Sequence, residues 1–402
     1  MTNEVKNVPE LRFPEFSEEW EDNLVGNIFE FKNGLNKGKE YFGYGIPIVN
    51  FKDVFHNRGI KSEYLNGKVD VSEKELQNYS VRKGDVFFTR TSEIIEEIGY
   101  PTVMMDEIPK AVFSGFVLRA RPKKNSKLVD DKFKRYVFFT YSFRKEMITK
   151  SSITTRALTS GTAINKMKVI YPTSIEEQNK IGEFFSKLDR QIELEEQKLE
   201  KLEEQKKGYM QKIFSQELRF KDENGNEYPE WEEKTIKDVY KVTRGYVLAR
   251  KLMSDSPNSI NKYPVYSSQT SNNGLMGYYS DYLYQDAITW TTDGANAGSV
   301  SFRQGKFYCT NVCGVLLNEL GNSNVCMAEM LNNIAFKYVS KVGNPKLMNN
   351  VMAMIKLKFP CLEEQQAISK FLIVFSEVID NQNKKVELLK ERKKGLLQKM
   401  FV

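Results

Sequence analysis

The chain contains one long stretch twice, and this internal repeat limits its possible folds more than any other feature. The first copy spans residues 176–214 and the second spans residues 363–401, and each begins with Glu-Glu-Gln. A constant shift of 187 positions, from Glu176 to Glu363, aligns the copies without a gap. Because a repeat of this kind determines the architecture, we expect a chain built from two related halves.

The apolar residues of each copy recur in alternating steps of four and three, which is the heptad pattern of a supercoiled helix. Each copy predicts a helix of about 38 residues, about 57 Å long. Glu195 and Lys206 interrupt the pattern in the first copy, and Gln382 and Lys393 interrupt it in the second. The apolar positions are Ile181, Phe185, Leu188, Ile192, Leu199, Leu202, Tyr209 and Ile213, then Ile368, Leu372, Phe375, Ile379, Val386, Leu389, Leu396 and Met400.

The helix ends carry further signals. Ser174 and Glu177 match a capping box and predict the start of the first helix, whereas the second copy has Cys361 at the capping place. Gly208 and Gly395 occupy matching places in the last turns. Since a helical glycine costs about 1 kcal/mol relative to alanine, this pair indicates either close approach of another backbone or early fraying.

Two arrangements of the helices fit the pattern: each helix pairs with another chain, or the two pair with each other in antiparallel orientation. We favour the second, because length and polar interruptions match. A one-heptad slip would place Glu195 opposite Lys393, but each lost apolar layer costs about 2 kcal/mol against about 1 kcal/mol for an exposed ion pair. Full overlap pairs Ile181 with Met400, Leu188 with Lys393, Glu195 with Val386, Leu199 with Gln382 and Ile213 with Ile368.

Composition narrows the class of protein. The 402 residues are enough for two or three domains, and 40% hydrophobic residues exclude a disordered chain. There is no apolar signal region and no run of 18 apolar residues, which indicates a soluble cytoplasmic protein. The net charge of +7 permits nucleic-acid binding without proving it. The four cysteines and single histidine lack metal-ligand spacing, so we expect reduced, structural thiols and no metal.

The repeat extends beyond the helices. Leu-Arg-Phe at 11–13, Trp20 and a glycine at 34 are matched by Leu-Arg-Phe at 218–220, Trp231 and a glycine at 245. The chain is therefore a tandem duplication of leader, variable globule and long helix. We predict an α+β fold of two mixed α/β globules in pseudo-twofold arrangement, joined by two long antiparallel coiled-coil helices. The predicted domains are residues 1–170, 171–216, 217–358 and 359–402.

Within the globules, apolar runs predict strands at 46–49, 86–88 and 287–290, and one helix at 131–150. Residues 151–156 read as a loop. The second globule has several short strands that end in Ser, Thr, Asn, Gln and Gly. Such loops are either ordinary turns or a surface built for hydrogen bonding.

A search for catalytic motifs finds none. Gly43 and Gly45 form a lone G-x-G without the flanking strand and helix of a nucleotide site. The Asn-Pro-Pro-aromatic motif of adenine methyltransferases is missing, since Asn344-Pro345 continues with Lys346. No P-loop is present, and the single histidine without a nucleophile motif argues against a catalytic triad.

The whole pattern resembles the specificity subunit of type I restriction-modification enzymes. The resemblance covers nearly the whole chain and rests on the leader Pro9 to Phe16 with Trp20, on the junctions Pro172…Glu-Glu-Gln and Pro360…Glu-Glu-Gln, and on the paired helices. It implies that each globule is a target-recognition domain reading one half of a split DNA site, while the helices set the spacer. Two reading heads must lie about 34 Å apart, or multiples of that, to meet one face of a duplex, and a rod of this length permits such a separation.

The resemblance also implies partners. Two modification subunits dock on the helices and methylate adenines, and restriction subunits add translocation and cleavage. S-adenosylmethionine, ATP and Mg are then expected on those subunits, and this chain is expected to be non-catalytic and to carry no cofactor. The competing interpretation is a coiled-coil scaffold or adaptor with two protein-binding globules, which would show no dependence on DNA sequence.

We expect Asn, Gln and Arg to read bases, and Lys, Arg and hydroxyls to contact phosphates. The alternatives are strand-end hydroxyls bonded to backbone for Thr89 and Thr291, turn caps for the asparagines, and a surface ion pair for Arg90. Candidates in loops after strands are Asn50, Lys52, Thr89, Arg90, Thr91 and Arg156 in the first globule, and Ser267, Ser268, Gln269, Asn272, Asn273, Thr291, Thr292, Asn296 and Asn311 in the second.

Overall fold

The computed structural model describes residues 7–153, 155–268 and 271–402. The chain divides into two compact units, and both divisions fall inside a long helix. Unit 1 consists of Met1–Glu196 and Lys384–Val402, and unit 2 consists of Gln197–Asn383. The long helices are α7 (Ile175–Phe214) and α11 (Leu362–Met400), so each unit contains part of both.

Unit 1 is built around a five-stranded sheet in the order β2-β10-β6-β8-β4, with smaller sheets β5-β3-β9, β11-β12-β7 and β1-β13. Its core is rich in buried aromatic residues, among them Trp20, Phe88 and Phe133. The strands are β1 (Glu21–Leu24), β2 (Phe29–Asn33), β3 (Phe42–Val49), β4 (Gly59–Ile60), β5 (Lys68–Val69), β6 (Val86–Thr89), β7 (Thr91–Ser92), β8 (Pro101–Met104), β9 (Val112–Phe113), β10 (Val117–Pro122), β11 (Ser152–Ile153), β12 (Ala157–Leu158) and β13 (Lys168–Tyr171).

The short helices of unit 1 differ from the sequence prediction at one place. The single helix predicted at 131–150 is wrong, because the chain forms two helices with a break between them. Thr140 begins the second one, since its hydroxyl accepts the backbone N–H of Phe143 at 3.4 Å. The helices are α1 (Val25–Ile28), α2 (Phe51–Phe55), α3 (Glu73–Asn78), α4 (Asp131–Val137), α5 (Tyr141–Lys150) and α6 (Gly161–Asn165).

Unit 2 is built around a six-stranded sheet in the order β15-β20-β18-β19-β16-β17, with a separate pair β14-β21. Helix α9 packs on this sheet, and Trp290 and Leu331 lie in the core between them. The strands are β14 (Glu232–Thr235), β15 (Lys241–Arg244), β16 (Tyr263–Tyr266), β17 (Leu275–Tyr279), β18 (Tyr284–Thr291), β19 (Val300–Cys309), β20 (Cys313–Leu317) and β21 (Lys356–Phe359), and the helices are α8 (Ile236–Val239), α9 (Val325–Ala335) and α10 (Asn349–Met354).

The two units share a common plan. In each, a leader strand pairs with the strand that precedes the long helix, as β1 with β13 and β14 with β21. A parallel pair also recurs, as β3 with β9 and β16 with β19. The matched glycines Gly34 and Gly245 are required for the same reason in both halves, because neither position has room for a side chain. A Cβ on Gly34 would lie 2.1 Å from the Ser114 carbonyl oxygen, and one on Gly245 would lie 1.8 Å from the Cys309 carbonyl oxygen. Close backbone approach therefore explains both glycines.

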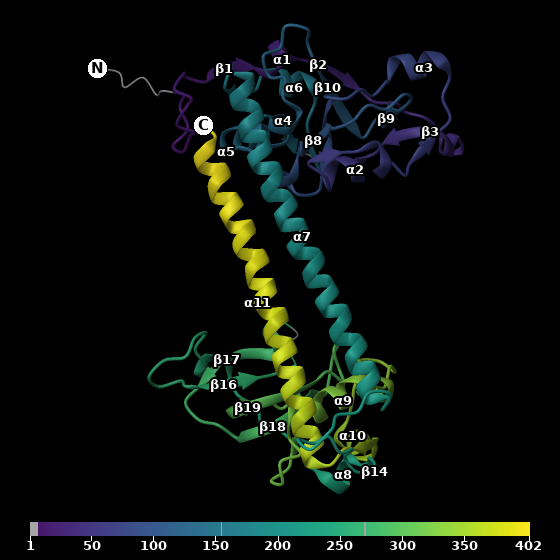
Figure 1. The fold of residues 1–402 in the computed structure, drawn as a ribbon, viewed down its shortest axis with the longest axis vertical. Helices are drawn as coiled ribbons and strands as arrows, with labels where there is room; N and C mark the ends of the chain where they lie inside the picture. The colour runs from purple at the N-terminus through teal and green to yellow at the C-terminus, as the bar shows by residue number, and fades with distance from the viewer. Residues whose placement is uncertain (1–6, 154, 269–270) are drawn as a thin grey trace. The chain divides into compact units, whose positions relative to one another are not determined.

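Within each unit, the two helix segments run antiparallel and side by side. In unit 1, Lys393 contacts Asp189 and Lys385 donates to Glu195 at 2.6 Å. In Figure 1 the yellow end of α11 lies beside the start of α7 in this unit. These pairs agree with the predicted full overlap and exclude the one-heptad slip, in which Lys393 would meet Glu195.

In unit 2, Lys206 donates to the Ser376 hydroxyl at 2.9 Å, and the Tyr209 ring lies 5.9 Å from that of Phe375. The polar heptad residues Lys206 and Lys393 therefore have polar partners next to the apolar residues that we expected them to face. Each lysine in the seam has its charge or donor satisfied by the other helix.

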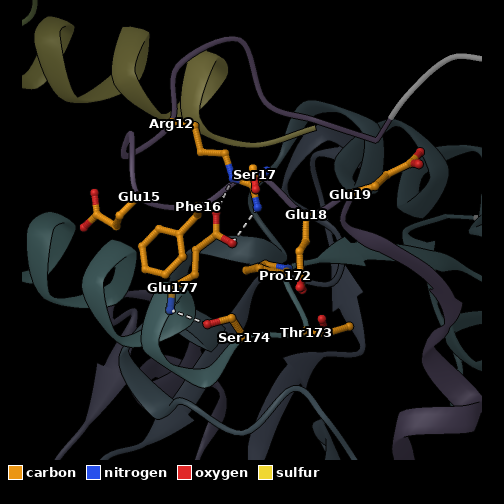
Figure 2. A pocket seen from close by; sticks show the side chains of 10 residues that line it. All are labelled: Arg12, Glu15, Phe16, Ser17, Glu18, Glu19, Pro172, Thr173, Ser174 and Glu177. Atoms are coloured by element: carbon orange, nitrogen blue, oxygen red, sulfur yellow. Dashed lines mark hydrogen bonds and ion pairs between the residues drawn. The ribbon is translucent and has the colours of Figure 1, made fainter.

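The repeated Glu-Glu-Gln motif fastens each long helix to its leader. Glu177 accepts hydrogen bonds from Arg12, at 2.7 and 2.8 Å, and from the Trp20 indole at 3.2 Å. Figure 2 shows the Glu177 carboxylate directed at Arg12, at the edge of a cavity of about 220 Å³. Ser174 does cap the helix, because its hydroxyl accepts the N–H of Glu177 at 3.2 Å. The Glu177 side chain faces the leader instead of closing the predicted capping box.

The second copy repeats this arrangement. Glu364 accepts from Arg219 at 3.2 and 2.7 Å and from the Trp231 indole at 2.8 Å. The following glutamines also correspond, since Gln178 donates to the Pro172 carbonyl and Gln365 to the Pro360 carbonyl, both at 2.8 Å. The leader, the preceding strand and the helix thus meet at one buried polar cluster in each unit.

Candidate nucleic-acid interface

The ends of three strands form one edge in unit 1. The Ser114 N–H donates to the Val49 carbonyl at 2.9 Å, which joins the segment after β9 to the end of β3. The Arg90 N–H donates to the Phe116 carbonyl at 3.2 Å, which adds the end of β6. Three loops that follow strands therefore lie together.

Unit 2 has the equivalent edge with equivalent hydrogen bonds. The Thr310 N–H donates to the Tyr266 carbonyl at 2.9 Å, which joins the ends of β19 and β16. The Thr292 N–H donates to the Val312 carbonyl at 3.2 Å, which adds the end of β18. The side chains on the two edges differ while the backbone bonding is the same, so the plan is suited to presenting two different polar surfaces.

Two predicted residues at the end of β6 have different environments. Thr89 is fully buried, and its hydroxyl accepts the Tyr100 N–H at 3.0 Å. Arg90 is half-buried, and its guanidinium donates to the Gly115 carbonyl at 3.0 Å. Thr89 holds the strand end from inside, so the structure does not support it as a DNA contact. Arg90 lies on the edge and keeps further donors.

Asn50 and Lys52 lie at the start of α2. Asn50 is half-buried; its backbone N–H donates to the Asp53 carboxylate at 2.8 Å, and its side-chain amide donates to the Ile48 carbonyl at 3.4 Å. Burial raises the pKa of Asp53. Lys52 is exposed. Asn50 thus takes part in local turn bonding, whereas the Lys52 side chain faces solvent.

Thr91 and Arg156 come together through a small sheet. Thr91 in β7 is half-buried and pairs with Leu158 in β12. Arg156, just before β12, is exposed and forms an ion pair with Glu93 at 3.3 Å. The sheet therefore brings these residues close to Arg90, although they are far apart in sequence.

Four predicted residues of unit 2 line one cavity of about 260 Å³. They come from separate loops that meet at the edge described above. They are Ser267, Asn273, Thr291 and Asn296. Polar side chains that are far apart in the sequence therefore lie at one place in the fold.

The other candidates in unit 2 are more varied. Thr292 is buried and donates to the Asp293 carboxylate at 2.7 Å, so its hydroxyl is used inside the protein. Asn311 is exposed on the turn between β19 and β20, and Asn272 is exposed beside the cavity. Ser268 is half-buried, and Gln269 lies outside the described residues.

Sequence reasoning missed the strand that forms the cavity wall. Ser301 and Arg303 alternate along β19 and line the cavity, together with Thr289 on β18 and Ser299. Their period of two is the signal that was available, because side chains two apart on a strand share a face. Burial lowers the pKa of Arg303, but a guanidinium remains charged at neutral pH.

The predicted helix-packing residues lie in the seams of α7 and α11. All twelve are buried or half-buried. They are Ile181, Phe185, Leu188, Ile192, Leu199 and Leu202 on α7, and Ile368, Leu372, Phe375, Ile379, Val386 and Leu389 on α11.

The four cysteines are free thiols, and three of them are buried. Burial raises the pKa of Cys309 and of Cys326. A thiol in such surroundings is a poor nucleophile. Over residues 7–153, 155–268 and 271–402, no group of three His, Cys, Asp or Glu side chains is placed to hold a metal, and no helix is long and apolar enough to cross a membrane.

Comparison with known proteins identifies the family. The family model for the type I restriction modification DNA specificity domain matches residues 17–204 and 228–391. A putative type I specificity subunit of Mycoplasma pneumoniae is 36% identical over 152 residues, which are 36% of this chain and 48% of that relative. The match thus covers about half of that relative's length. A putative type I restriction enzyme specificity subunit of Methanocaldococcus jannaschii is 24% identical over 98% of this chain and 95% of its own length.

A solved structure has the same fold. The crystal structure of a type I restriction-modification system S subunit from M. genitalium matches with a TM-score of 0.61 and 15% identity, over 98% of this chain and 99% of that one. At this identity the likeness concerns the fold alone, and it agrees with the two related units and the two long helices. The matched family segments cover most of both units, so this chain belongs to the type I restriction modification DNA specificity domain family.

Proposed function

We propose that this chain is the DNA-recognition subunit of a type I restriction-modification complex, in which each unit reads one half of an asymmetric, bipartite site. One observation carries the proposal. The same strand-end edge recurs in both units with the same backbone hydrogen bonds, yet its side chains differ. Unit 1 presents Arg90, Thr91 and Arg156, whereas unit 2 presents Ser267, Thr291 and Asn311. Two related scaffolds with unlike polar surfaces suit two unlike half-sites.

The long helices are proposed to set the spacer and to dock two methyltransferase subunits. Supporting this, their outward faces carry exposed aliphatic side chains in both units. These are Leu194 on α7, and Ile373, Val374, Val378 and Leu388 on α11. Val374 and Val378 are four residues apart and are therefore neighbours on the surface of α11, and neighbouring exposed apolar side chains are typical of interaction sites.

Catalysis is proposed to belong to the partner subunits. These would hold S-adenosylmethionine for adenine methylation, and ATP with Mg for translocation and cleavage. The absence of a catalytic motif from the sequence supports this division of labour. In a soluble holoenzyme acting on host DNA, the chain would work in the cytoplasm.

The test is to sequence methylated adenines in cells that express the chain with its methyltransferase partner, and in cells that lack the chain. One split, asymmetric motif should depend on the chain. The double variant Thr291→Val, Asn311→Ala should then change or abolish recognition of one half-site. Replacing Arg90→Ala should affect only the other half-site. If no adenine motif depends on the chain while its partner is present and active, the proposal is wrong.

A matched control comes from an exposed residue of unit 2 that does not line the cavity at its edge. Lys237 is exposed on α8 in unit 2, so Lys237→Gln should leave the motif unchanged. If all of these variants weaken both half-sites equally, the division of recognition between the units is refuted.

A further inference from the structure

The cavity at the edge of unit 2 is polar, and one positively charged side chain, that of Arg303, is part of its lining. The cavity has a volume of about 260 Å³, far above the roughly 10–15 Å³ that one water requires. Apart from Trp290 and Cys313, its lining is made of glycine, hydroxyls, amides and one guanidinium. These polar residues are Ser267, Asn273, Thr289, Thr291, Asn296, Ser299, Ser301 and Arg303.

Arg303 is fixed in one orientation. Its Nε donates to the Thr289 hydroxyl at 3.1 Å, and its Cζ lies 3.9 Å from the centroid of the Tyr266 ring. Only 8% of the residue is exposed. Because Nε is bonded to Thr289 and the Tyr266 side chain also hydrogen-bonds to the guanidinium, a ligand would use the remaining donors of the two terminal nitrogens.

The charge of Arg303 is not neutralised by the cavity wall. No carboxylate is found among the described residues that line the cavity. The nearby Asp293 accepts from Thr292 at 2.7 Å and forms an ion pair with Lys346 at 3.5 Å. A recessed cation surrounded by neutral donors favours an anion.

The recess decides which part of DNA fits. The floor of the major groove lies about 8.5 Å below the backbones, so a side chain that reads bases must project from the protein. Arg303 does the reverse, since it is buried, whereas Asn296 in the lining of the same cavity is exposed. The group that projects from a duplex toward a protein cavity is the backbone phosphate.

We propose that this cavity binds one backbone phosphate of the DNA, with Arg303 as its cation and the Asn296 amide and the Ser299 and Ser301 hydroxyls as neutral donors. Arg303 is then a positioning residue, which holds the DNA in register against unit 2 while the exposed side chains of the edge read bases. This inference rests on the proposed function, and it adds a residue and a contact that the function alone does not specify.

The experiment measures binding of the complex of this chain and its methyltransferase partner to duplexes carrying its target motif. Each duplex has a single methylphosphonate, which removes the charge of one phosphate. We expect one position in the half-site of unit 2 to weaken wild-type binding about 10- to 100-fold, the range for a hydrogen bond to a charged group. Arg303→Gln should weaken binding to unmodified DNA by a similar factor and show no further loss at that position. For this variant, the slope of log affinity against log salt concentration should fall by about one, which is the loss of one phosphate contact.

Lys306→Gln is the matched control. Lys306 is on the same strand and lies over the Tyr282 ring, but it does not line the cavity. Its replacement should add its own effect to that of every methylphosphonate. Because Arg303→Gln can disturb the core, Asn296→Ala tests the cavity from its exposed side, and a few-fold loss that is non-additive at the same phosphate is expected.

The proposal is overturned if Arg303→Gln and Asn296→Ala are additive with every methylphosphonate. It is also overturned if Arg303→Gln changes the preferred base at one position, which would make Arg303 a base reader. Failure of the proposed function has a different signature, because the wild-type complex itself would then bind all duplexes equally.

Discussion

Arg12 and Glu177 form a two-pronged ion pair that joins the leader to the first long helix, with N–O distances of 2.7 and 2.8 Å. The side chains are 9% and 2% exposed, so the pair is buried. Arg219 and Glu364 form the same pair in unit 2. Both halves of the duplication therefore contain the same ion pair between leader and helix, as well as the helix itself.

Glu177→Gln is expected to destabilise unit 1 by about 3 kcal/mol, since it leaves a buried guanidinium without its counter-charge. Glu364→Gln should destabilise unit 2 by a smaller amount. Arg219 also donates to the Tyr228 and Pro229 carbonyls and is 21% exposed, whereas no other acceptor for Arg12 occurs among the described residues. Chemical denaturation of the two variants measures the difference.

The exposed neighbour Glu176 provides the control for this prediction. Glu176→Gln removes the same charge from the same helical turn without touching Arg12, and should change stability by only a few tenths of a kcal/mol. Equal losses for Glu176→Gln and Glu177→Gln would show that the ion pair does not fasten the helix.

The helices were predictable and the fastening point was not, for a physical reason. Heptad periodicity is a local property, so residues such as Ile181 and Ile368 reveal the seam from sequence alone. The partner of Glu177 lies 165 residues earlier in the chain, and no local pattern encodes that contact. The same holds for Arg303, whose role depends on burial between Thr289 and Tyr266. The break between α4 and α5 was missed because Thr140 acts as a cap within a continuous apolar pattern.

Gly208→Ala and Gly395→Ala are each expected to stabilise the isolated chain by about 1 kcal/mol, the helix-propensity difference. No described atom lies within 4 Å of a Cβ added at either position. Both helices also continue past these glycines, to Phe214 and Met400, so the structure shows neither of the reasons that the sequence suggested. Urea denaturation gives the free energies of unfolding.

Gly182→Ala is the comparison on the same helix. A Cβ there would lie 2.6 Å from the backbone nitrogen of Phe133, so overpacking should cost about 1–3 kcal/mol. The prediction is that the free energy of unfolding falls for Gly182→Ala and rises for Gly208→Ala. A loss of stability at Gly208 would mean that its surroundings differ from those in this structure.

Thr89→Val is expected to lower stability by about 1–3 kcal/mol and to leave the methylated motif unchanged. The valine removes the hydroxyl that accepts the Tyr100 N–H, and a buried unpaired donor costs this much. Thr291→Val, at the rim of the cavity, should instead leave stability nearly unchanged and change the methylated motif. Thermal unfolding and methylated-adenine sequencing of both variants separate the two roles, and a changed half-site for Thr89→Val would return Thr89 to the interface.

The last prediction concerns pH. The Ser72 backbone N–H, followed by Lys37 and the Ser72 hydroxyl, lowers the pKa of Glu75 from 4.5 to about 2. Because the folded pKa is below the unfolded one, the unfolded chain binds more protons between these values, and this contribution to stability is present above pH 4.5 and lost toward pH 2. Glu75→Gln should therefore lower the melting temperature most near neutral pH, and the difference from wild type should shrink as the pH falls from 4.5. A difference that stays constant across this range would show that Glu75 is not held in its charged form by these contacts.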